Sequence, residues 1–150
     1  MQENKPTSEI KGRTIYHSAF SNIFINKFNS LLGKYNIKPI PKNWRASTTF
    51  SPAAPKKGNW NGLCYQNSLD YVRSHPGTYL AIGYHIDKAV AKRVMKDNSE
   101  YLDVTKHAWV LDNEGRVIDI TFGRESPGVY IGKVIPSNNL KDGADVRSRF

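Results

Sequence analysis

The chain has 150 residues, of which 39% are hydrophobic and 23% charged, the size and composition of a single domain with one core. No stretch approaches the roughly 20 apolar residues that a membrane span requires, and residues 1–13 lack the apolar segment of a secretory signal. The net charge of +9 favours anionic partners, so we expect a soluble, basic, cytoplasmic protein.

The first third of the chain predicts one helix and one loop. Residues 1–13 are polar and are expected to be loose. Apolar residues at helical spacing predict a helix over about 17–33 that ends at Gly33; they are Ile15, Phe20, Ile23, Phe24, Phe28, Leu31 and Leu32. Prolines at 39 and 41 exclude a helix there, and 44–61 is typical of an irregular loop because it contains Pro52, Pro55 and Gly58.

A second helix is expected directly after this loop. Tyr65, Leu69 and Val72 recur at helical spacing until Pro76 and Gly77 interrupt the pattern, which places Cys64 in the first turn. A strand is predicted over 78–84, and a short exposed helix over 88–97.

The last third predicts antiparallel strands. Residues 105–122 are typical of a hairpin with a turn at 113–115, and alternation puts Val117, Asp119 and Thr121 on the same face. A final strand over 129–135 ends at Pro136, and the polar tail 137–150 is expected to be loose. The fold class is therefore α+β: a helix carrying Cys64 packed on an antiparallel sheet, with an extra N-terminal helix and a core of about 58–135.

The only cysteine, Cys64, excludes an intrachain disulfide and a multi-thiolate zinc site. A helix N-terminus favours the thiolate, which is the nucleophilic form. His107 could serve as the base and acid, and Asp119, one strand later in the hairpin, could orient the imidazole. We therefore predict a Cys64–His107–Asp119 catalytic triad.

The loop before Cys64 offers further candidates for substrate binding. The backbone N–H of Cys64 could stabilise an oxyanion, with the amides of Asn59 or Asn61 as the second donor. Trp60 could form a wall of the substrate groove. Asn67 lies one turn along the helix from Cys64, where it could support the site or only contribute to packing.

The motifs G-L-C-Y-Q-N-S at 62–68, H-A-W-V-L-D-N-E-G-R-V-I-D-I-T at 107–121 and V-Y-I-G at 129–132 resemble those of Cys-His-Asp proteins in the transglutaminase-like and papain-like superfamily. They are most similar to small bacterial and phage proteins with a G-x-C-Y-x-N motif. The resemblance covers about 58–135, with Ile120 where a proline is common. It implies a papain-like or transglutaminase-like core, and a location in the host cytoplasm if the chain is of phage origin.

For function, the resemblance implies acyl chemistry on a protein or peptide: hydrolysis, glutamine deamidation or transamidation. Cys64 then aligns with the nucleophile, His107 with the base and Asp119 with the orienting acid. A thiol protease or another cysteine hydrolase or acyltransferase is the activity that follows.

The alternative is a non-catalytic basic protein on the same scaffold that binds a host protein or a nucleic acid. In that case Cys64 is a buried structural thiol, His107 a strand histidine and Asp119 a surface carboxylate. Such a protein would use basic clusters that are otherwise solvated faces: Lys56 and Lys57, residues 88–96, and Arg147 and Arg149. Tryptophans that could stack on bases are more often core or groove walls: Trp44, Trp60 and Trp109.

No metal ion or other cofactor is expected. The remaining histidines, His17, His75 and His85, have no partners at a recognisable metal-binding spacing.

Overall fold

The computed structural model describes residues 19–97 and 102–150. The loose segment expected at 1–13, together with Ile15, His17 and the side chain of Phe20, lies outside the described residues. The elements of the described part, in chain order, are α1 (Ala19–Lys34), β1 (Arg45–Ser47), α2 (Cys64–Ser74), β2 (Tyr79–Asp87), α3 (Lys88–Met95), β3 (Thr105–Leu111), β4 (Val117–Ile118), β5 (Gly128–Ile135) and α4 (Gly143–Arg147). The α+β class is therefore confirmed.

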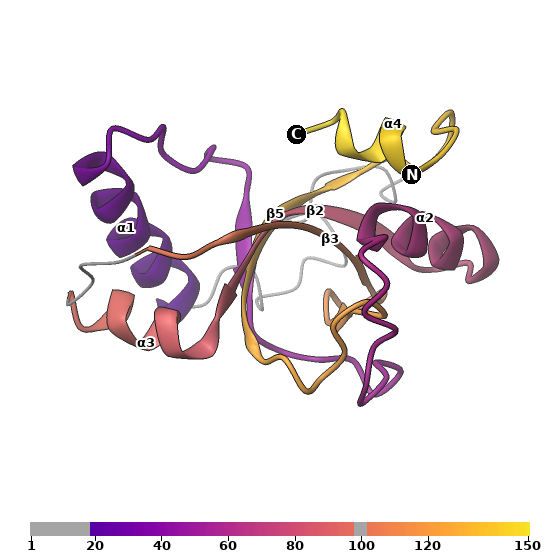
Figure 1. The fold of residues 1–150 in the computed structure, drawn as a ribbon, viewed down its shortest axis with the longest axis horizontal. Helices are drawn as coiled ribbons and strands as arrows, with labels where there is room; N and C mark the ends of the chain where they lie inside the picture. The colour runs from indigo at the N-terminus through magenta and orange to yellow at the C-terminus, as the bar shows by residue number, and fades with distance from the viewer. Residues whose placement is uncertain (1–18, 98–101) are drawn as a thin grey trace.

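The strands form one sheet in the order β1-β5-β2-β3-β4, and each neighbouring pair is antiparallel. The two edges of the sheet approach each other just beyond β1. Val117 of β4 donates its N–H to Thr49 O at 2.9 Å and accepts from Ser51 N at 2.8 Å. This bridge curls the sheet towards a barrel, and the bent strands are visible in Figure 1.

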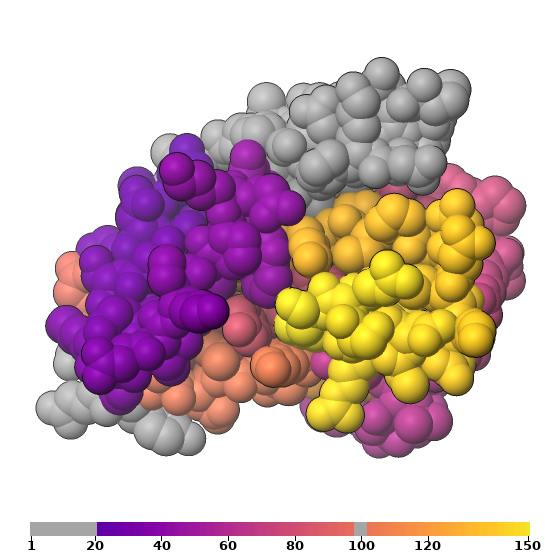
Figure 2. Space-filling view, turned by 90° about the horizontal axis from the view of Figure 1, so that it is seen from above, coloured from indigo at the N-terminus to yellow at the C-terminus, as the bar shows by residue number. Residues whose placement is uncertain are grey.

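Helices cover the two ends of the curled sheet. At one end α1 packs beside α3, and at the other α2 packs beside α4 (Figure 1). The first end is filled by a buried cluster that includes Phe24, Phe28 and Ile86, and the second by one that includes Leu69 and Ile82. In the view from above, the indigo α1 segment and the yellow C-terminal segment occupy opposite sides of the molecule (Figure 2).

The helix predicted over 17–33 is present as α1, but Gly33 does not terminate it. Asn36 takes the left-handed conformation with φ 57°, and its N–H bonds to Gly33 O at 3.1 Å. The N–H of Ile37 bonds to Leu32 O at 3.0 Å, which completes a Schellman cap around Asn36. Asparagine tolerates this conformation better than most residues, so the helix continues past the glycine.

The loop predicted over 44–61 contains the short edge strand β1, which sequence reasoning missed. Its three residues, Arg-Ala-Ser, are too few and too polar to give a strand pattern. Tertiary pairing with β5 makes them a strand, with Arg45 opposite Gly132. Trp44, just ahead of β1, is buried in the core.

The expectation that 137–150 is loose is wrong. This segment contains α4, whose first turn is capped by the Asp142 side chain accepting from Asp145 N at 3.1 Å. Leu140 and Val146 are buried against α2, and Gln66 Oε1 accepts from Gly143 N at 2.8 Å. Two apolar contacts suffice to hold a polar segment, and they leave no periodic pattern in the sequence.

The helix expected over 88–97 is present as α3, but only one of its faces is exposed. Val90, Ala91 and Val94 are buried in the cluster shared with α1. None of the helices in the described part of the chain is both long and apolar enough to cross a bilayer.

Candidate active site

Cys64 is the first residue of α2, as the sequence predicted, and its side chain is half-buried. The first intrahelical hydrogen bond runs from Asn67 N to Leu63 O at 2.8 Å. The N–H groups of the first turn, that of Cys64 included, therefore have no acceptor within the helix. These N–H groups are free to donate to an oxyanion that forms beside the thiol.

His107 lies on β3 opposite Gly83 of β2, and its ring is buried. The ring stacks almost parallel on Phe122, with centroids 4.1 Å apart. Its Nε2 donates to Asp119 Oδ2 at 2.8 Å. The second nitrogen, Nδ1, is therefore the one left to interact with Cys64, which is among the groups that raise the pKa of His107.

Asp119 is completely buried and accepts four hydrogen bonds. Oδ2 accepts from His107 Nε2 and from the hydroxyl of Tyr130 at 2.6 Å. Oδ1 accepts from the backbone N–H groups of Thr121 and Phe122, both at 3.0 Å. A carboxylate with all these donors is held in one orientation, and it holds the imidazole in turn.

The position of Asp119 differs from the expected second strand of the hairpin. Pairing between β3 and β4 covers only two residue pairs and ends at Ile118, so Asp119 opens a turn in which its backbone O accepts from Gly123 N at 2.9 Å. Val117 and Ile118 still point to opposite faces, because they pair with Leu111 and Val110, but both faces are covered and Val117, Ile118 and Asp119 are all buried. The carboxylate reaches His107 from a turn rather than from a cross-strand neighbour.

Each ionisable group of the site shifts the pKa of its neighbours. Burial of the His107 ring lowers its pKa, but the hydrogen bond with Asp119 and the interaction with Cys64 outweigh this and raise the pKa to about 9. Burial raises the pKa of Asp119, yet the hydrogen bond from His107 brings it below the ordinary value. Burial and the Asp119 charge raise the pKa of Tyr130. At neutral pH the set is an imidazolium, a carboxylate and a neutral phenol.

Asn67 and Asn61 connect the start of α2 to the turn that carries Asp119. Asn67 Nδ2 donates to Thr121 Oγ1 at 2.9 Å and to Asn61 Oδ1 at 2.8 Å. Asn61 Oδ1 also accepts from Leu63 N at 3.1 Å, next to the start of α2. The Asn67 amide donor is therefore bound to protein oxygens and is not directed at an oxyanion.

The loop residues Asn59 and Trp60 are fixed by their backbones. Asn59 N donates to Ile120 O at 3.1 Å and Trp60 N to Thr121 O at 3.0 Å. The Asn59 side chain is exposed, and it makes no hydrogen bond to any residue that the structure describes. The Trp60 ring is 56% exposed and stacks on Phe122 at 4.9 Å, so it forms a wall continuous with the His107 ring. Gly58 permits this close approach, because a Cβ there would lie 2.1 Å from Thr121 O.

Tyr130, Phe122 and His85 are site residues that sequence reasoning missed. Tyr130 belongs to the V-Y-I-G motif, which was the only available signal for it. His85 is buried with its ring centroid 6.0 Å from that of His107, and its Nε2 bonds to Ser126 O at 3.1 Å. Burial, and then the charge of His107, lower the pKa of His85, so it stays neutral beside the imidazolium.

The other aromatic and histidine candidates lie away from this cluster. Trp44 and Trp109 are both buried in the core, and His75 stacks on Tyr71 at the exposed end of α2. Across residues 19–97 and 102–150, no group of three or more His, Cys, Asp or Glu side chains is arranged to hold a metal ion.

A cavity of about 520 Å³ adjoins the start of α2, between that helix and α4. Its walls include Leu63, which is 55% exposed, together with Tyr65 and Arg147. Leu63 and Trp60 therefore present apolar surface on the chain immediately before Cys64. A substrate that reaches the thiol has apolar contacts available there.

No protein-family model, curated protein or solved structure matches this chain.

Proposed function

We propose that the protein is a cysteine-dependent enzyme of the papain-like or transglutaminase-like type, which cleaves or exchanges acyl groups of a protein or peptide substrate. The observation that carries this proposal is the connected set of Cys64, His107 and Asp119. The thiol is at a helix start, the His107 imidazole is close enough to it for Cys64 to raise the pKa of the ring, and a fully buried carboxylate 2.8 Å from Nε2 orients the ring. A structural cysteine needs none of these contacts.

In the acylation step, the Cys64 thiolate attacks the substrate carbonyl carbon and a carbon–sulfur bond forms. The oxyanion lies near the unpaired N–H groups at the start of α2. As the carbon–nitrogen bond breaks, His107 gives its Nδ1 proton to the leaving amine. Asp119 and the Tyr130 hydroxyl keep the ring in place while its charge changes.

In the second step a water molecule or an amine attacks the thioester. Neutral His107 removes its proton and the carbon–sulfur bond breaks, which regenerates the thiolate and the imidazolium. Water gives hydrolysis or, on a glutamine side chain, deamidation. An amine gives transamidation. The exposed Trp60 and Leu63 support a substrate with an apolar residue beside the reacting carbonyl.

The first test is acylation by p-nitrophenyl acetate, which should give a burst of nitrophenolate equal to the enzyme concentration, with the acetyl group located on Cys64 by mass spectrometry. The Cys64→Ala variant should give no burst. His107→Asn should slow acylation at pH 6 by about 100-fold, while the exposed His75→Ala should not. A thiol that reacts no faster in the native protein than in urea would contradict the proposal.

The second test identifies the substrate. Incubation with protein extracts, followed by mass spectrometry of thioesters trapped on Cys64, should identify an acyl donor. Biological function retained by the Cys64→Ala variant would instead support the alternative, a binding protein on the same scaffold.

A further inference from the structure

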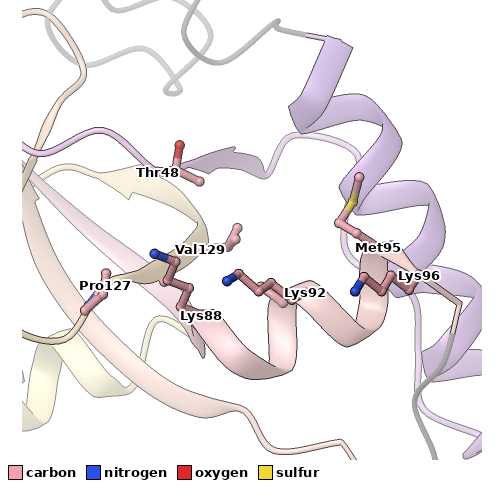
Figure 3. Close-up of a pocket in the computed structure, with 9 residues that line it drawn as sticks. Thr48, Lys88, Lys92, Met95, Lys96, Pro127 and Val129 are labelled. Atoms are coloured by element: carbon pink, nitrogen blue, oxygen red, sulfur yellow. The ribbon is translucent and has the colours of Figure 1, made fainter.

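A second concave surface lies at the other end of the sheet, where α3 faces the beginning of β5. This groove has a volume of about 570 Å³, within the range of ligand-binding sites. One wall is the lysine-bearing side of α3, and the other includes Thr48, just past β1 (Figure 3). The groove exists because β1 ends at Ser47. There the chain stops pairing with β5 and crosses to β4.

Three lysines line the α3 side of the groove: Lys88, Lys92 and Lys96. They are spaced four residues apart, so they lie on one face of the helix, about 6 Å apart along its axis. Figure 3 shows them along the same side of α3, with Thr48 across the groove. The groove therefore has a row of positive charge about 12 Å long.

These charges have no acidic partner among the residues that the structure describes. The nearest acids in the sequence are otherwise engaged: the Asp87 side chain caps α3 by accepting from Ala89 N at 2.9 Å, and Asp97 pairs with Lys27 at 2.7 Å. Like charges four residues apart also destabilise a helix. An anion in the groove would remove that repulsion.

The floor of the groove is apolar. Ala91 and Val129 are 7% and 3% exposed, and Met95 packs against the same core cluster. A ligand that fills the groove must therefore present apolar groups to the floor and anionic groups to the lysines. A fully hydrophilic polyanion would satisfy only the second requirement.

We propose that this groove binds an extended, acidic segment of a polypeptide in which acidic and apolar residues alternate. In an extended chain, side chains two residues apart share a face and are separated by about 6.6 Å, close to the lysine spacing. The intervening side chains then point to the apolar floor. A row of 12 Å corresponds to about four or five residues.

The lining favours this ligand over a single-stranded nucleic acid. Nucleic-acid sites combine cations with aromatic rings on which the bases stack, and neither an aromatic ring nor an arginine lines the described part of the groove. Lysine ammonium groups act as point charges and can each bind a separate carboxylate.

The test uses the full chain and a fluorescent peptide with the core Glu-Val-Glu-Val-Glu, measured by anisotropy at low salt. The Lys88→Gln/Lys92→Gln/Lys96→Gln variant should bind at least about tenfold more weakly. A matched variant, Lys38→Gln/Lys42→Gln/Lys141→Gln, removes the same charge from exposed positions elsewhere and should change binding less than about twofold. Both variants should keep the native circular dichroism spectrum.

Two further ligands distinguish the alternatives. A Gln-Val-Gln-Val-Gln peptide and a Glu-Gly-Glu-Gly-Glu peptide should each bind more weakly than the Glu-Val peptide. The first lacks the carboxylates that pair with the lysines, and the second lacks the apolar side chains that contact the floor. The proposal is overturned if the two lysine variants weaken binding equally or if the three peptides bind equally. It is also overturned if a single-stranded oligonucleotide binds more tightly than the Glu-Val peptide. Acylation of Cys64 should be the same in both lysine variants, so the result is independent of the proposed catalytic function.

Discussion

The two ends of the sheet use charge in opposite ways. Around Asp119 the charges are buried and paired, and the carboxylate receives four hydrogen bonds from β3, β5 and its own turn. Along α3 the lysines are unpaired within the described residues and face an open groove. Buried paired charges fix geometry, which serves chemistry. Unpaired charges at a surface remain available for association.

The largest effect is expected from breaking the buried pair. Asp119→Ala leaves the His107 imidazolium and two backbone N–H groups without their acceptor, so we expect a loss of about 3–5 kcal/mol in the free energy of unfolding. Urea denaturation measures this. The control, Asp70→Ala, removes an exposed carboxylate that accepts from Gln66 Nε2 at 2.8 Å and should cost less than about 0.5 kcal/mol. Equal effects would show that the pair contributes little.

The pH dependence of stability should follow His107. Its pKa is raised from 6.5 to about 9 on folding, so its contribution is complete below pH 6.5 and is lost as the pH rises through 9. We expect a decrease of about 3 kcal/mol in the free energy of unfolding over this window. The His107→Asn variant should lack this decrease. His85, whose pKa is lowered, affects stability only on the acidic side of 6.5.

A smaller effect is expected at the edge of the same network. Tyr130→Phe removes the hydroxyl that donates to Asp119 Oδ2 but leaves the other three hydrogen bonds. We expect a loss of about 1–2 kcal/mol in the free energy of unfolding, with acylation of Cys64 slowed. Tyr79→Phe is the matched control at a half-buried tyrosine. A Tyr130→Phe protein as stable as the wild type would show that the phenol does not support the carboxylate.

The smallest effect has the opposite sign. Replacing Lys88, Lys92 and Lys96 with glutamine removes repulsion along α3, so it should stabilise the protein by about 0.5 kcal/mol. The gain should disappear at high salt, where the repulsion is already screened. Thermal unfolding at two salt concentrations tests this, with the Lys38, Lys42 and Lys141 variant as the control. Destabilisation would mean that the lysines have structural partners.

Much of the candidate site was predictable because its signals are local. The loop 44–61, followed by apolar residues at helical spacing, located the start of α2 at Cys64, and the strand pattern placed His107 near Asp119 in one hairpin. Tyr130 could not be assigned in this way. In the sheet, β5 is separated from β3 by β2, and only the curling of the sheet brings the Tyr130 hydroxyl to the turn after β4.

The sequence by itself determined the α+β class, the position of Cys64 at a helix start and the presence of basic residues over 88–96. Helix caps and periodic spacing depend on neighbours a few residues away, so they can be seen in the chain. The tertiary structure alone decided the four donors around Asp119, the burial of the C-terminal segment and the groove beside the lysines. Each of these depends on contacts between segments far apart in the chain, and those contacts form only when the sheet curls and its helices pack.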